Sequence, residues 1–84
     1  MKNESLLTGK QVEVFCTNVT KQESADMILA QSQLFYPQYK VNFDLDDCDN
    51  IFRVEFCEKI NLEVIQHVFQ KNGFRVCLLE DHQN

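Results

Sequence analysis

The chain has 84 residues, of which 44% are hydrophobic and 25% are charged, and its formal net charge is −5. This composition is typical of one small globular domain. The acidic balance disfavours nucleic acid as a partner, because proteins that bind it neutralise phosphates with basic side chains. No apolar run is long enough to span a bilayer, and the polar start lacks the apolar stretch of a secretory signal, so we expect a cytoplasmic protein without membrane contact.

The polarity of the two ends predicts the domain boundaries. Residues 1–10 are polar and predict a flexible N-terminal segment, and residues 81–84 predict a polar tail. Between them, residues 11–80 predict one folded domain.

The first strand is predicted over Gln11–Thr17, with the sequence QVEVFCT. Side chains alternate between the two faces of a strand. We expect Val12, Val14 and Cys16 to face the core, which leaves Phe15 on the outer face.

A helix is predicted to begin at a capping box, Thr20–Glu23, in which the Thr hydroxyl accepts from a helical amide and the Glu carboxylate reaches back. Pro37 is expected to end this helix near residue 35, because proline disfavours helical geometry in the residue before it. Helical spacing places five side chains on one stripe toward the core: Ala25, Ile28, Leu29, Ser32 and Phe35.

Lys40–Glu58 has the alternation of a β-hairpin. A loop at Asp47–Asn50 would make one face wholly apolar and place Asp44 opposite Arg53, a favourable cross-strand pair. Three apolar pairs would then face each other across the hairpin: Leu45 with Phe52, Phe43 with Val54, and Val41 with Phe56.

A second helix is predicted after Asn61, a residue type that caps helix N-termini. Its buried stripe consists of Leu62, Ile65, Val68 and Phe69. Asn72 and Gly73 predict a left-handed C-cap. A last strand follows over Phe74–Leu79, with Phe74, Val76 and Leu78 inward and Arg75, Cys77 and Leu79 outward.

The predicted order of elements is β-α-β-β-α-β, two β-α-β halves joined by the hairpin. This is the ferredoxin-like arrangement, an α+β two-layer sandwich. Right-handed crossovers place both helices on one face of a four-stranded antiparallel sheet, with the expected strand order 4-1-3-2.

Three stretches carry a resemblance to a known family: VEVFCTNVTKQESADMIL, VNFDLDDCDNIFRVEF and IQHVFQKNGFRVCLL. Together they resemble the heavy-metal-associated domain, the fold of small copper chaperones and of the metal domains of copper pumps. That family carries M-T-C-x-x-C between its first strand and first helix. Here Lys21 and Ser24 stand at the two cysteine positions, so the resemblance implies the fold and carries over no metal ligand.

Two other groups of residues have the chemistry of a metal site. Carboxylates cluster in the hairpin turn, where they favour Ca²⁺ or Mg²⁺ on one reading and a plain structural turn on the other: Asp44, Asp46, Asp47 and Asp49. The four cysteines form no C-x-x-C pair, and we expect reduced thiols: Cys16, Cys48, Cys57 and Cys77. His67 and His82 have no evident catalytic companion and are expected at the surface.

These observations favour a non-enzymatic binding or regulatory module that has lost thiolate metal binding. We expect no catalytic residue, no cofactor and no metal ligand, and a partner that is another protein or a second copy. The candidate contact surface has four residues: Phe15, Lys21, Cys77 and Leu79. The alternative is a metal-binding or metal-trafficking protein with a displaced site, at the cysteines or at the acidic turn 44–49.

Overall fold

The computed structural model describes residues 10–79. Most of the predicted N-terminal segment, the predicted tail and His82 therefore lie outside the described residues. The elements follow the predicted order: β1 Gln11–Thr17, α2 Gln22–Phe35, β2 Lys40–Asp44, β3 Ile51–Phe56, α3 Leu62–Lys71 and β4 Val76–Leu78.

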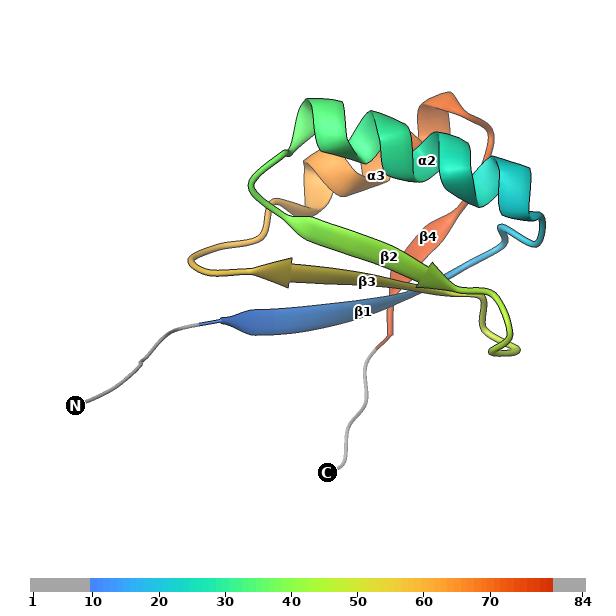
Figure 1. Ribbon diagram of the computed structural model, residues 1–84, viewed down its shortest axis with the longest axis horizontal. Helices are drawn as coiled ribbons and strands as arrows, with labels where there is room; N and C mark the ends of the chain where they lie inside the picture. Colours follow the sequence, from blue (N-terminus) through green and yellow to red (C-terminus); the bar gives the residue numbers. More distant parts are fainter. Residues whose placement is uncertain (1–9, 80–84) are drawn as a thin grey trace.

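The four strands form one sheet in which every pairing is antiparallel. Its order is β2-β3-β1-β4, which reads 4-1-3-2 from the β4 edge. Both helices lie over the same face of the sheet, so the molecule has two layers (Figure 1). Within residues 10–79, neither helix combines the length and apolarity needed to cross a membrane.

The core fills the space between these layers and is rich in aromatic rings. Phe52 is fully buried, and its ring centroid lies 4.9 Å from that of Phe43 and 5.0 Å from that of Phe69. Two aromatic residues between α2 and β2, Tyr36 and Tyr39, are also buried, which the sequence pattern did not predict.

The predicted facing of β1 is wrong. Phe15 lies opposite Phe52 and is 2% exposed, whereas Val12 is 50% exposed. Each alternating set of β1 contains apolar side chains, so the pattern alone does not decide which set is buried. Burying the larger aromatic ring removes more apolar area from water, and Val12, Val14 and Cys16 are left on the other face.

The hairpin forms, but its predicted register is wrong by two residues. Phe43 lies opposite Phe52 and Val41 opposite Val54, so the turn covers residues 45–50. A slip of two residues keeps every side chain on its face, and the apolar pattern therefore does not distinguish the two registers. Asp44 still reaches Arg53, at 3.6 Å, from a diagonal position.

Of the two N-caps predicted from the sequence, the structure confirms one. The predicted capping box at Thr20 is wrong, because Lys21 occupies the N-cap of α2 and makes no side-chain cap bond. The cap of α3 is confirmed: the Asn61 side-chain oxygen accepts from the amides of Glu63 and Val64 at 3.0 and 3.3 Å.

The C-terminal ends of the helices show the same contrast. Gly73 adopts a left-handed φ of 82° after α3, as predicted, and the Phe74 amide donates to the Phe69 carbonyl at 2.9 Å. Phe35, predicted to be buried, is 48% exposed at the end of α2. Its ring lies edge-on to His67 and 4.8 Å below the Lys71 ammonium group.

Candidate functional site

One face of the sheet is left uncovered by α2 and α3 (Figure 1). We call it the open face. It carries alternate side chains from each strand, together with the residue that follows β4: Val12, Val14, Cys16, Lys40, Asn42, Asp44, Ile51, Arg53, Glu55, Cys77 and Leu79.

The open face has an apolar half and a charged half. β1 and the β4 segment contribute valines, cysteines and Leu79, with Val12 50% exposed and Leu79 38% exposed. The other half carries charges that form ion pairs: Arg53 of β3 with Asp44 of β2 at 3.6 Å, and Glu55 of β3 with Lys10, the residue before β1, at 3.4 Å. The apolar half is therefore the part that a partner could cover without breaking ion pairs.

The structure brings together only two of the four predicted contact residues. Cys77 and Leu79 are exposed on the open face, as predicted. The prediction of Phe15 as a contact residue is wrong, because Phe15 lies on the core face of β1 and is buried. Lys21 lies at the start of α2, in the helix layer.

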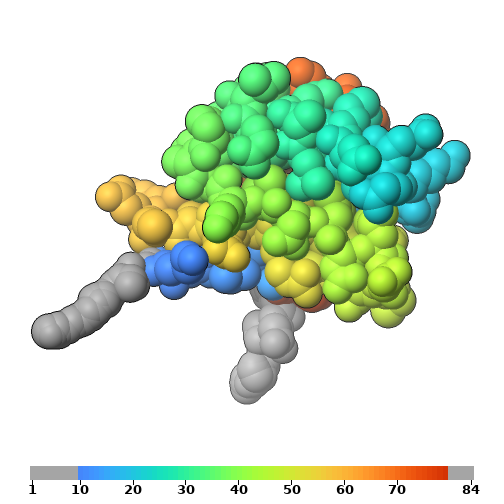
Figure 2. Space-filling model, viewed as in Figure 1, coloured from blue at the N-terminus to red at the C-terminus, as the bar shows by residue number. Residues whose placement is uncertain are grey.

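The acidic turn lies against the end of β1. The Thr17 amide donates to the Asp49 carbonyl at 3.1 Å, and the Thr17 hydroxyl donates to the Asn50 carbonyl at 2.8 Å. In the space-filling view the turn forms the yellow-green projection at the lower right (Figure 2). These backbone bonds place the acidic side chains beside the Cys16 end of the apolar half.

The turn gathers only part of the predicted carboxylate set. Ligand atoms of Asp47, Cys48 and Asp49 lie within 4.8 Å of one another, whereas Asp44 pairs with Arg53. Asp47 Oδ1 accepts from the Asp49 amide at 2.9 Å, a bond by which aspartate stabilises turns. Asn50 completes the turn with a left-handed φ of 50°. The turn thus has a structural explanation without a metal ion.

Of the four cysteines, Cys16 does not lie where the sequence pattern placed it. Cys16 was predicted to be in the core, but it is half-buried on the open face, directly opposite Cys77 in β4. Cys48 lies in the turn and Cys57 follows β3, at opposite ends of that strand. All four thiols are free.

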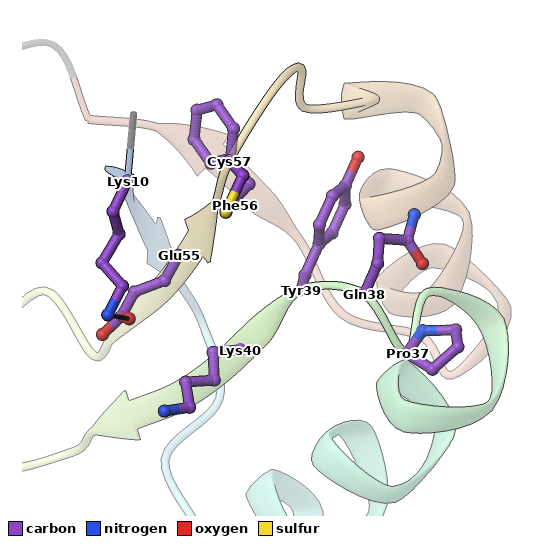
Figure 3. Close-up of a pocket in the computed structure, with 8 residues that line it drawn as sticks. All are labelled: Lys10, Pro37, Gln38, Tyr39, Lys40, Glu55, Phe56 and Cys57. Atoms are coloured by element: carbon purple, nitrogen blue, oxygen red, sulfur yellow. Dashed lines mark ion pairs between the residues drawn. The ribbon is translucent and has the colours of Figure 1, made fainter. Parts of the chain in front are cut away.

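A pocket of about 220 Å³ opens at the other end of the hairpin (Figure 3). Its walls come from the loop after α2, from β2 and from the end of β3, with the Lys10–Glu55 pair on one side and Pro37 and Gln38 on the other. The Tyr39 hydroxyl accepts from the Asn61 amide at 2.9 Å and donates to the Lys59 carbonyl at 3.1 Å. The polar tip of Tyr39 is thus committed to holding the loop before α3. No sequence signal predicted this pocket, since its residues are far apart in the chain.

Comparisons with known proteins find no matching family model, no matching curated protein and no matching solved structure.

Proposed function

We propose that this chain is a non-enzymatic binding module that holds a basic segment of another protein on the apolar half of its open face. The observation that supports this most directly is the adjoining pair on β1 of Val12, which is 50% exposed, and Val14, which is half-buried, on the face that the helices leave bare. Exposed apolar side chains that adjoin one another mark contact sites more often than single ones do.

The charge around this row indicates the chemistry of the partner. Asp46, Asp47 and Asp49 are exposed in the turn that adjoins the Cys16 end of β1. The whole chain carries a net charge of −5. A segment that alternates apolar and basic side chains would place its apolar groups on the valines and its basic groups beside the turn, and opposite charges accelerate such encounters.

The fold itself is part of the proposal. The element order, the antiparallel pairings and the strand order support a ferredoxin-like fold. We propose it as a heavy-metal-associated-type domain that lacks the thiol pair of that family at Val19–Ser24. The four free cysteines fit a reducing compartment such as the cytoplasm.

A titration with a defined peptide tests the binding proposal. The probe is a 12-residue peptide of alternating leucine and lysine, added to isotope-labelled protein and followed by NMR chemical shifts. We expect shifts at Val12, Val14 and Leu79, and weaker binding at higher salt. A peptide of alternating leucine and glutamate is the matched control and should not bind.

Two substitutions that introduce a negative charge then locate the binding site. Val12→Glu on the open face should weaken binding of the leucine-lysine peptide at least tenfold. Leu34→Glu is the control, because Leu34 is 80% exposed on α2 in the other layer, and it should change the affinity less than twofold. Shifts confined to α2 and α3, equal binding by Val12→Glu, or a dimer formed through the open face without peptide would overturn the proposal.

A further inference from the structure

Cys16 and Cys77 are direct cross-strand partners between β1 and β4. They belong to the hydrogen-bonded class of antiparallel pairs. The Leu79 amide donates to the Val14 carbonyl at 2.9 Å and the Asn18 amide to the Arg75 carbonyl at 3.4 Å. Hydrogen-bonded pairs alternate along a ladder, and Cys16–Cys77 lies two residues from each of these bonds.

The class of the pair determines how far apart the thiols are held. The α-carbons of a hydrogen-bonded pair are about 5.5 Å apart, against about 4.5 Å in the other class. The β-carbons of directly opposite residues are about 4.5–5.5 Å apart, and the shorter distances belong to pairs that are not hydrogen-bonded. A hydrogen-bonded pair such as Cys16–Cys77 therefore lies toward the longer end of this range. A disulfide needs β-carbons within about 3.5–4.5 Å. The spacing is therefore wide for a direct sulfur–sulfur bond and leaves room for one bridging atom, since two metal–thiolate bonds of about 2.3 Å span up to about 4.6 Å between the sulfurs.

The surroundings favour an ion that needs few ligands. Across the described part of the chain, the one group of three or more potential ligands is the Asp47–Asp49 turn, so no third His, Cys or carboxylate joins the pair. Zinc requires four ligands. Soft monovalent d10 ions prefer thiolates and accept two of them in a line.

A pocket of about 290 Å³ gives access to both thiols, and Arg75 lines it as well. Two thiolates and one monovalent cation together carry a charge of −1. The guanidinium group in the same pocket offsets that charge.

We propose that Cys16 and Cys77 form a two-thiolate chelate for one soft monovalent d10 metal ion. Each thiol releases one proton as the ion binds, and no electron is transferred. The site is distinct from the loop Val19–Ser24, and it does not depend on the peptide-binding function proposed above.

Silver(I) is the probe, because it does not change oxidation state in the experiment. One equivalent is added to reduced protein, glutathione is added in tenfold excess over protein, and native mass spectrometry counts bound silver. A single protein thiol should lose silver to the competing monothiol, whereas a chelating pair should retain one ion. The protein with silver should also melt at a higher temperature, because the ion binds only the folded arrangement.

The matched variants each remove defined thiols. Cys77→Ser and Cys16→Ser should each lower the silver affinity at least 100-fold and abolish the thermal shift. The double variant Cys48→Ser/Cys57→Ser removes two thiols that lie apart, and it should retain one silver ion. Cys77 is exposed, so its serine variant should keep the fold, and circular dichroism checks this.

Three results would overturn the chelate. They are retention of silver by both Cys77→Ser and Cys16→Ser, loss of silver by the Cys48/Cys57 variant, and failure of the unmodified protein to retain silver against glutathione.

Discussion

The hydroxyl groups of Ser32 and Tyr36 lie 2.8 Å apart, one helical turn from each other inside the core. Ser32 donates its single hydrogen to the Ile28 carbonyl at 2.7 Å, so Tyr36 is the donor between the two hydroxyls. Ser32 is fully buried and Tyr36 is 1% exposed. The end of α2 thus carries a buried polar pair in which each hydroxyl donates one hydrogen bond.

This pair predicts how stability depends on alkaline pH. Burial raises the pKa of the Tyr36 hydroxyl above its usual value of 10.0, because the charged phenolate would lose its hydration inside the core. The folded state therefore keeps the proton at pH values where the unfolded state loses it. The contribution of Tyr36 to the free energy of unfolding should be complete below about pH 10 and lost as the pH rises from there through the folded-state pKa.

Tyr36→Phe is the matched variant for this titration. Chemical unfolding between pH 8 and pH 11 should show a steeper loss of stability in the original protein than in the variant. The difference in slope should approach about 1.4 kcal/mol per pH unit for one proton. Equal slopes would contradict the prediction.

The facing of β1 in the structure predicts that truncating Phe15 destabilises the protein much more than truncating Val12. Phe15→Ala should lower the free energy of unfolding by about 3–5 kcal/mol, because it leaves a cavity beside Phe52. Val12→Ala should change it by less than about 0.5 kcal/mol, because Val12 is half-exposed. Urea unfolding measures the stability of both variants. A larger loss for Val12→Ala than for Phe15→Ala would indicate that Val12 and not Phe15 faces the core.

The two helix N-termini predict another contrast. Asn61→Ala should cost about 1 kcal/mol, because it removes the acceptor of two helix amides. Thr20→Ala should be neutral within about 0.5 kcal/mol, because Thr20 is exposed and does not cap α2. A loss of 1 kcal/mol or more at Thr20 would show that the capping box forms in solution.

Substitution of Gly73 should lower stability through backbone strain alone. A β-carbon at this position would meet no atom within 4 Å, but φ is 82°. Gly73→Ala should therefore lower stability by about 1–2 kcal/mol, and Gly73→Asn should lower it less, because asparagine tolerates left-handed geometry better. Thermal unfolding of the two variants provides the comparison, and an alanine variant as stable as the original chain would contradict the assigned φ.

The elements and their order could be predicted from the sequence, because local signals determine them. Alternation located β1 and the hairpin, Asn61 marked the start of α3, and Gly73 marked its end. Each of these signals acts within a few residues, so a neighbouring stretch of chain is enough to recognise it.

Three features were decided only by the tertiary structure. The facing of β1 depended on whether the core packs around Phe15 or around Val12, Val14 and Cys16. The hairpin register depended on the turn, since a slip of two residues leaves the apolar pattern intact. The pairing of Cys16 with Cys77 depended on β4 lying beside β1, which brings together residues 61 positions apart. In each case the deciding contact joins distant parts of the chain, and a local pattern carries no information about such a contact.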